Sequence, residues 1–600
     1  MLRTSRTACF WAILATSALA CTTETEPDDG VGGSDAGAAG SGGAAAGSGG
    51  SAGSGGSAGE DPGDAGSGVV GCGSRSVSAA TVVRDTISTS QTWAGTVHVQ
   101  GDVYVVEGAV LTIQPGTHVI FAADAHLDVG WNSGAATLLA SGTAAAPITF
   151  CGETGDPGYW RGLSIQNNVT SNSVLEHVLI ADAGGQAQAL LVNAEVKVSD
   201  VHVDNSDLAG VRAAAFGESS ARLSVSGTRG APVVITSPEA LSPFPLGGEF
   251  EDNTDNTVHL DFTDIPGPTV LHDPGIPYVL DNPVDVTDGA DLTFEAGVEV
   301  RFAADAGLDI GWNSGDVVLA VNGTAAAPVE FRGVAEEPGF WEGIAIRSNV
   351  RTSSTLSHLL IRNSGGGEEG ALRVEAKIRV NDVQLAQNDK GAWIGAQGLA
   401  TGSANLSITS TEAVPLTVSP DALISLPEGG SFTGNSLDQI AVEAGDFSVS
   451  GSVPNLGVAY RVLGDIDTVI DSSMTIAAGT HFVMTADADI EFGWNSGSAA
   501  VIARGTAVAP IQFSGVEETA GFWEGLSVGV AVLSSSAFEY VEISDAGPNC
   551  LTLQRDLSVT NSSFNRCEAY GISKLSTDLT DYTLTNSFTG MGTGSVFAGL

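Results

Sequence analysis

A five-residue string that occurs three times, Gly-Trp-Asn-Ser-Gly, holds the side chains best suited to binding chemistry. Its copies span residues 130–134, 311–315 and 493–497, with spacings of 181 and then 182 residues. An indole ring can stack on a sugar ring through CH–π contacts. The string therefore predicts a row of glycan-contacting positions along one face: Trp131, Trp312 and Trp494, with Asn132, Asn313 and Asn495. The competing interpretation, which the flanking glycines favour, is a tight turn, because Gly and Asn tolerate the left-handed backbone region.

Acidic residues recur beside the same strings and could, in principle, bind a metal ion. They are Asp124, Asp305 and Asp487, each followed four residues later by Asp128, Asp309 and Glu491. A calcium site needs about six to eight converging oxygen atoms, and one carboxylate pair per copy falls short of that. The Gly-Gly-x-Gly-x-Asp array of calcium-loaded β-rolls is also absent from the sequence. We therefore expect solvated carboxylates, no metal site and no cofactor.

The sequence gives little support for catalysis. It contains no His-Glu-x-x-His zinc string and no phosphate-binding loop. His177 and His358 share a register in the repeat, but Tyr540 replaces them in the third copy, which indicates a packing position. We therefore predict no catalytic residue.

The net charge is −47, from 23 basic and 70 acidic residues in a chain of 600. A field of that sign repels phosphate backbones, so we expect no nucleic-acid partner. It would keep an elongated protein soluble, and we expect a monomer. No apolar stretch of about 18 or more residues follows the N-terminal region, so no transmembrane helix is predicted.

Residues 1–20 have the features of an export signal, with Arg3 and Arg6 before an apolar run that ends in small residues. The string Ala-Leu-Ala-Cys at 18–21 resembles the processing box of bacterial lipoproteins, in which the new N-terminal cysteine carries diacylglycerol. The resemblance implies lipidation of Cys21. Ala18 stands where that family prefers Leu, and ordinary signal-peptidase cleavage is the alternative. Thr22 is not the Asp that retains such lipoproteins at the inner membrane, so the resemblance implies the outer membrane or surface of a Gram-negative cell.

Residues 21–71 combine the candidate lipid anchor with a low-complexity stretch of Gly, Ala and Ser. Such a stretch buries too little apolar surface to order itself. We interpret it as a spacer between the membrane and the folded part, or as a segment of no selected length.

Beyond the linker, short apolar runs alternate with Gly, Asn, Asp or Pro about every 8 to 12 residues, which is typical of short strands. A solenoid, a sandwich and a propeller all fit many short strands. The propeller period of about 40 to 50 residues is absent, and the strand rhythm continues without the linkers that repeated sandwiches would need. The pattern therefore favours an all-β solenoid.

Several local strings resemble the right-handed parallel β-helix of pectate-lyase-like proteins. They are Leu-Thr-Ile-x-Pro-Gly at 111–116, Pro-Ile-x-Phe at 147–150 after Gly-Thr, and Pro-Gly-Tyr-Trp-x-Gly-Leu-x-Ile at 157–165. The resemblance covers residues 86–600 and implies a fold rather than a chemistry. The lyases of that fold use an Arg or Lys base beside calcium-bound Asp residues, and here no arginine repeats in register from copy to copy.

The repeat divides the folded part into an N-terminal cap at 72–85 and three blocks, at 86–266, 267–448 and 449–600, the last with a C-terminal cap. Each coil of such a solenoid takes about 20 to 25 residues, so we expect about 20 to 25 coils, several per block. A second tryptophan set precedes a strand in each block and should wedge between coils: Trp160, Trp341 and Trp523.

Four cysteines remain after the signal and Cys21, an even number in an exported chain. Three pairings are open, and we predict Cys72–Cys151 and Cys550–Cys567, because each pair lies at one end of a linear stack. Each bond would stabilise a fraying terminus by about 3 to 4 kcal/mol in the chain-entropy model.

Two functions follow from these features. Repetition without a catalytic constellation favours a binding or structural rod, adhesin-like or glycan-contacting, with a polysaccharide or cell-surface ligand and a lipid anchor in the membrane. The alternative is a polysaccharide lyase or hydrolase with a site in a lateral groove. A binder should show similar surfaces in each block, whereas an enzyme should concentrate acids, arginines and aromatics in one block. Block differences in the sequence look mostly like conservative apolar exchanges, which favours the binder.

Overall fold

The computed structural model describes residues 71–132, 134–287, 289–313, 315–469, 471–486, 488–493 and 498–599. The predicted export signal, Cys21 and all of the linker but its last residue lie outside this part of the chain, as do Asp487, Trp494 and Asn495. The structure therefore bears on the cap and on most of the three blocks.

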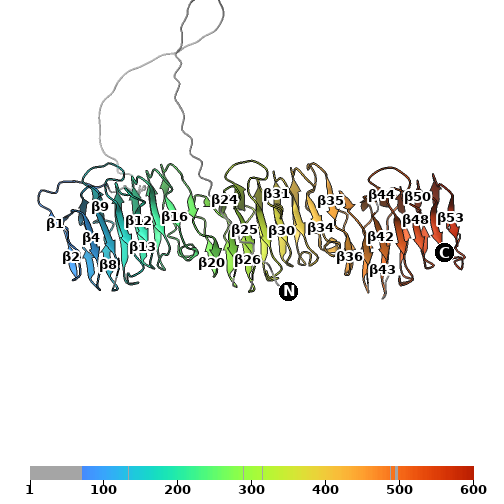
Figure 1. Ribbon diagram of the computed structural model, residues 1–600, viewed down its shortest axis with the longest axis horizontal. Helices are drawn as coiled ribbons and strands as arrows, with labels where there is room; N and C mark the ends of the chain where they lie inside the picture. The colour runs from blue at the N-terminus through green and yellow to red at the C-terminus, as the bar shows by residue number, and fades with distance from the viewer. Residues whose placement is uncertain are drawn as a thin grey trace, which may run out of the picture. The chain divides into compact units, whose positions relative to one another are not determined.

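Short strands wind into coils in which each strand pairs in parallel with the coils before and after it. One coil runs through β6 (His118–Phe121), β7 (His126–Val129) and β8 (Thr137–Ser141), and β9 (Ile148–Gly152) then returns to pair with β6. About 21 turns follow one another from the blue to the red end of Figure 1. The fold is thus a parallel β-helix, as predicted.

The interior of the coils is one continuous apolar core from Ile87 to Tyr582. In β5 (Val110–Ile113), for example, Leu111 and Ile113 are buried, while Val110 and Thr112 are partly exposed. This alternation follows from the period of two along a strand. The described helices are three short 3-10 turns, η1 (Pro238–Ala240), η2 (Pro420–Ser425) and η3 (Tyr582–Leu584), and none of them could cross a membrane.

Some repeated residues serve the corners of the coil. β11 (Val174–Ala181) bends at His177, which has a φ of 48°, and so pairs with β8 before the bend and with β9 after it. A Cβ atom on Gly142 would lie 2.6 Å from the His177 carbonyl oxygen, so glycine is needed where the next corner stacks on it. His358 and Tyr540 hold the same left-handed conformation in the other blocks.

The second tryptophan set packs in the core, as predicted. Trp341 is fully buried, stacks on Phe302 with ring centroids 3.9 Å apart, and donates a hydrogen bond from Nε1 to the Arg362 carbonyl oxygen at 2.7 Å. Trp160 and Trp523 are buried in the same way.

Both predicted disulfides are confirmed. Cys72–Cys151 joins the N-terminal cap to β9 with a Cα–Cα distance of 6.1 Å, and Cys550–Cys567 spans 5.5 Å near the other end. The first bond is reinforced by Arg75, which donates to the buried carboxylate of Asp182 at 2.5 Å.

Strand pairing continues through both block junctions. At each junction, however, a strand of one block pairs onto a face that its counterpart in the previous block does not occupy. β18 (Val258–Leu260) lies on the face of β7 and pairs with β21 (Tyr278–Leu280), which in turn pairs with β24 (Glu299–Phe302). In sequence β24 is the counterpart of β6, not of β7. A block therefore contains one strand position more than a whole number of coils. The second junction makes the same shift. There β34 (Leu416–Val418) pairs with β35 (Gln439–Val442), β35 pairs with β38 (Ala459–Val462), and β38 pairs with β41 (His481–Met484), the counterpart of β24.

The shift contradicts the predicted row of tryptophans along one face. Trp131 follows β7, whereas Trp312 follows β25 (Gly307–Ile310), which belongs to a different sheet. β42 (Asp489–Phe492), the counterpart in the third block, lies in yet another sheet. A row would form only if the repeat length were a whole number of coils.

Candidate functional site

The repeated string forms a turn and also exposes its indole. Gly130 and Gly311 have φ values of 85° and 84°, and a Cβ atom on Gly130 would lie 2.8 Å from the Val169 side chain. Trp131 and Trp312 are nonetheless 49% and 53% exposed. Two neighbouring amides, Asn132 and Asn313, are exposed as well. The turn and the exposed binding group are therefore compatible.

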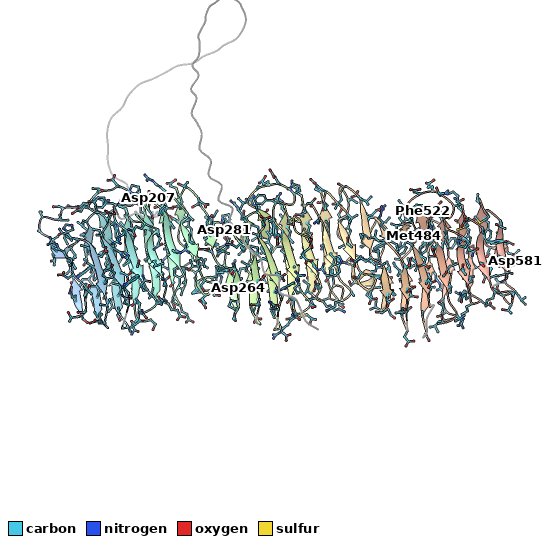
Figure 2. The ribbon with its side chains drawn as sticks, in the orientation of Figure 1. Asp207, Asp264, Asp281, Met484, Phe522 and Asp581 are labelled. Carbon is cyan, nitrogen blue, oxygen red and sulfur yellow. A yellow bond between two sulfur atoms is a disulfide. The ribbon has the colours of Figure 1, made fainter. Side chains whose placement is uncertain are left out.

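The face beside Trp312 carries polar and aromatic side chains on successive coils of the second block. Its strands are β19 (Asp264–Ile265), β22 (Val284–Val286), β25, β28 (Gly343–Ile346), β30 (Leu372–Val374), β32 (Ala392–Ile394) and β34. Their central outward positions stack in register across successive coils: Asp264, Asp285, Asp309, Ala345, Arg373, Trp393 and Thr417. We call this face, together with Trp312, the Trp312 face; Figure 2 labels Asp264, where the ladder begins.

Arg347, directly after β28, is the centre of an ion-pair network on this face. Its guanidinium donates to Asp309 at 2.7 and 3.0 Å, and it lies 3.3 Å from both Glu369 and Glu375. Its side chain is only 14% exposed. The hydrogen bonds to Asp309 raise the pKa of Arg347 despite its partial burial. Arg347 is therefore a fixed cation, held 4.9 Å from the Trp312 ring.

Arg373 and Trp393 extend the network by two coils. The Arg373 guanidinium lies 4.0 Å from the centre of the Trp393 ring and donates to Glu375 at 2.8 Å. Burial would raise the pKa of Glu375, but hydrogen bonds from Arg373 and Arg347 hold it below its usual value. The Trp393 Nε1 donates to Glu443 at 3.0 Å.

Gly395 allows the indole of Trp393 to lie along this face. A Cβ atom at that position would come within 2.7 Å of the ring. The repeat could not mark Trp393 as a site residue, because the equivalent positions in blocks 1 and 3 hold Arg212 and Ser573.

The blocks differ strongly at these exposed positions. Where block 2 has Arg347, the matched residues are Gln166 in block 1 and Gly529 in block 3. Gln166 donates a hydrogen bond to Asp128. Burial raises the pKa of Asp128 to about 6, and the hydrogen bond from Gln166 only partly offsets this rise. In block 3, burial and then Glu491 and neighbouring acids raise the pKa of Asp489 to about 7. The expectation that blocks differ mainly by apolar exchanges is therefore wrong on this face.

A cavity of about 200 Å³ opens in the Trp312 face between β22, β25 and β28. Its charged lining is Asp285, Asp309, Glu342, Arg347, Glu368 and Glu369. Within the part of the chain that the structure describes, no group of three or more His, Cys, Asp or Glu side chains is arranged to hold a metal ion.

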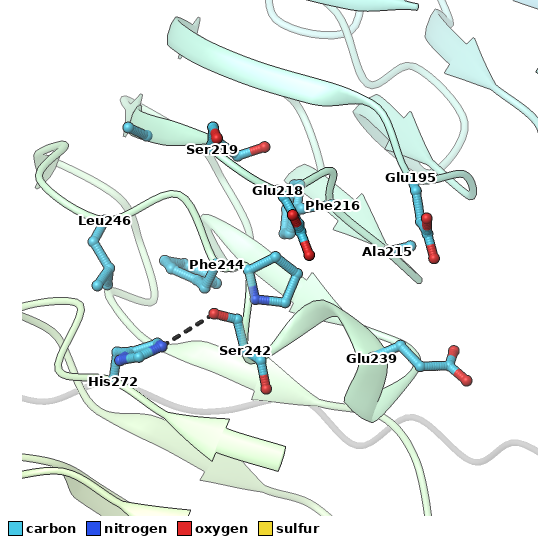
Figure 3. Close-up of a pocket in the computed structure, with 13 residues that line it drawn as sticks. Glu195, Ala215, Phe216, Glu218, Ser219, Glu239, Ser242, Phe244, Leu246 and His272 are labelled. Carbon is cyan, nitrogen blue, oxygen red and sulfur yellow. Dashed lines mark hydrogen bonds between the residues drawn. The ribbon is translucent and has the colours of Figure 1, made fainter. Parts of the chain in front are cut away.

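Larger cavities lie at the two block junctions, beside η1 and η2, with volumes of about 560 and 520 Å³. Figure 3 shows the first, with His272 and Leu246 at the end opposite Glu195 and Glu239. Its aromatic floor, Phe216 and Phe244, is only 2% and 3% exposed. These cavities offer no exposed aromatic ring, so we place the candidate site on the Trp312 face.

An arginine ladder on another face of block 2 could not be anticipated. Arg301, Arg332 and Arg362 are register partners on β24, β27 (Val329–Gly333) and β29 (Thr355–Arg362). Glu299 pairs with the first two, at 2.7 and 2.8 Å, and Glu330 lies 3.7 Å from the third. The ladder is therefore largely neutralised within the protein.

The Trp312 face has the parts of a sugar-recognition surface. Trp312 and Trp393 are separated by three strand spacings, roughly 14 Å along the stack, with fixed charged donors and acceptors between them. Such a face can stack on rings and hydrogen-bond to their substituents. No protein-family model, curated protein or solved structure matches the chain.

Proposed function

We propose that this chain is an exported lipoprotein whose β-helix contacts glycans through the Trp312 face. The observation that carries the proposal is the half-exposed Trp312 ring beside Arg347, with Trp393 on the same face three coils further on. Aromatic rings supply contact area at low conformational cost, and rigid charged side chains supply orientation. Asn313, next to Trp312 and exposed, adds a further hydrogen-bonding group.

The placement in the cell is part of the proposal and rests on the N-terminal sequence. Cys21 would carry the lipid, the low-complexity segment would act as a tether, and the β-helix would stand at the outer membrane or cell surface of a Gram-negative bacterium as a monomer. Two or more acyl chains anchor a protein stably, whereas one does not. Replacing Cys21 with Ser should move the protein from the membrane fraction to the soluble fraction of cells. If the variant stays with membranes, ordinary processing and another mode of attachment are indicated.

The enzyme alternative is favoured by one specific observation, the concentration of arginines and acids in block 2. It would make the protein a lyase or hydrolase akin to the pectate-lyase-like enzymes. Arg347 does not suit the role of a base, because three carboxylates hold it as a cation. Incubation with acidic and neutral polysaccharides should give neither double-bond absorbance nor new reducing ends. Turnover above background would replace the binding proposal with this alternative.

The binding proposal predicts that Trp312→Ala weakens glycan affinity about tenfold, because one stacked ring is worth about 1 to 1.5 kcal/mol. The measurement is calorimetric titration of the full-length protein with a panel of oligosaccharides. Trp131→Ala is the matched control, since that indole is equally exposed but lies on another face beside Tyr104. Equal losses in both variants, or no loss in Trp312→Ala, would contradict the assignment of the site.

A further inference from the structure

The first block junction is connected by fewer backbone ladders than the coils on either side of it. The sheet that contains β11 ends at β17 (Phe250–Glu251), and new ladders begin at β19 and at β20 (Thr269–Leu271). In the described residues of this junction, the ladder through β16 (Val233–Ile235), β18 and β21 is the one that passes from block 1 to block 2. Side chains that bridge neighbouring coils therefore provide part of the connection here.

His259, on β18, makes one such bridge between two carboxylates. Its Nδ1 lies 2.7 Å from an oxygen of Asp281, which follows β21, and its Nε2 lies 2.7 Å from an oxygen of Asp255. An ionised carboxylate can only accept, so both ring nitrogens must carry a proton to satisfy both contacts. Burial lowers the pKa of His259, but the hydrogen bonds to Asp281 and Asp255 outweigh it, so the pKa is raised overall.

His272, directly after β20, bridges three successive coils. Its Nδ1 lies 2.8 Å from an oxygen of Glu295 on the next coil, and its Nε2 lies 3.0 Å from the Ser242 carbonyl oxygen on the previous one, the contact marked in Figure 3. Both partners are acceptors, so this ring also has to donate from both nitrogens. A neutral imidazole has one N–H group, so deprotonation would leave one contact of each histidine without a donor.

The strands beside His259 add no free charge at its level. Its register partners on β16 and β21 are Val234 and Val279. One coil further out on each side, on β14 (Ala209–Ala213) and on β24, the register partners are arginines that are already paired: Arg212 with Asp261, and Arg301 with Glu299.

The surroundings of His272 are acidic. Asp273 follows it in the chain, and the cavity that it lines also contains Glu195, Glu218 and Glu239. Negative charges favour the protonated ring.

The second junction has the same architecture without these rings. Pro454 stands at the position of His272, and its carbonyl oxygen accepts from a tyrosine hydroxyl at 2.7 Å, as that of His272 does at 2.8 Å. Ala441 stands at the position of His259. The protein therefore contains its own comparison, a junction of the same build that lacks the two titratable bridges.

We infer that the first block junction is a pH-sensitive joint, which the imidazolium forms of His259 and His272 hold together and which loosens when they lose a proton. For His259 the sign follows from linkage, because a raised folded-state pKa adds stability that is complete below the unfolded pKa and is lost as pH rises through the folded value. Its contribution should be complete below about pH 6 and should decline above about pH 7. The inference concerns the stiffness of the β-helix and does not depend on any ligand.

The test is hydrogen exchange of the full-length protein, resolved along the chain and expressed as protection relative to the unstructured rate at each pH. Between about pH 5.5 and about pH 8 the histidines change from charged to neutral. Protection of β18, β20 and β21 should fall about three- to tenfold over this range, because each partly exposed ion pair contributes modestly. Protection of β35 and β38, in the second junction, should stay the same.

Two double variants separate the joint from a general effect of pH. His259→Gln with His272→Gln should show the lower protection of the first junction at both pH values. The matched control, His202→Gln with His481→Gln, removes two histidines outside the junction that each contact a serine hydroxyl. It should keep the pH dependence of the wild type.

The wild-type comparison of the two junctions decides the question even if the first double variant does not fold. Equal changes at both junctions, or no change at the first, would overturn the inference. A pH dependence that persists after His259→Gln with His272→Gln would overturn it too.

Discussion

Replacing Trp341 with Ala should destabilise the middle of the β-helix by about 3 to 5 kcal/mol. The side chain is fully buried, stacks on Phe302 and satisfies the Arg362 carbonyl oxygen, so its removal leaves both a cavity and an unpaired acceptor. In a solenoid each coil contacts only its neighbours, so the loss should stay local. Hydrogen exchange resolved along the chain should show faster exchange in β24, β27 and β28, with little change in block 1.

The matched variant is Trp160→Ala, which removes the counterpart stack on Phe121. It should give a similar loss confined to block 1. The exposed Trp312→Ala should change stability by less than about 0.5 kcal/mol. Uniform destabilisation along the whole chain after Trp341→Ala would show that the coils unfold as one unit, contrary to this prediction.

Replacing Arg347 with Gln, the residue at the matched position of block 1, should destabilise block 2. Asp309 would lose its bidentate partner while staying partly buried, and Glu369 and Glu375 would keep only Arg373. Removing one partner of a buried pair costs about 3 to 5 kcal/mol, and partial exposure reduces this to about 2 to 3 kcal/mol. Denaturant titration of wild type and variant measures the difference in the free energy of unfolding.

The pH dependence of that difference has a defined sign. Arg347 helps to hold the pKa of Glu375 below its usual value. A group with a lowered pKa in the folded state contributes stability above its unfolded pKa and loses it as pH falls through the folded value. The gap between wild type and Arg347→Gln should therefore shrink on acidification below about pH 4. Adding Asp309→Asn to Arg347→Gln should restore part of the lost stability. A gap that persists unchanged at low pH would show that packing, not charge, is responsible.

The features that sequence could predict depend on short-range patterns. Alternating apolar residues specify strands, repeated glycines specify corners such as Gly142, and four cysteines at the ends of a linear stack have a natural pairing. The buried role of Trp341 followed from its place before a strand. Each of these needs only local spacing and the idea of stacked coils.

The candidate site needed information that spacing alone does not carry. Trp393 has no aromatic counterpart, and Arg347 replaces Gln166 and Gly529, so neither is marked by the repeat. The contacts of Arg347 also depend on coils of unequal length. Glu375, on the next coil, is 28 residues after Arg347, whereas Asp309, on the previous coil, is 38 residues before it. The row of Trp131 and Trp312 was wrong for a related reason, because a repeat that does not close on a whole coil moves its copies to another face.

The shifted faces limit how the protein can gain avidity. Avidity requires two contacts to be made at once. The loops after β7 and β25 project from different sheets, and so from different faces of the β-helix. A planar layer can therefore meet one of these loops at a time. A three-dimensional mesh of polymer strands can meet several, each strand from its own side. The geometry therefore offers no simultaneous contact of both loops with one flat surface.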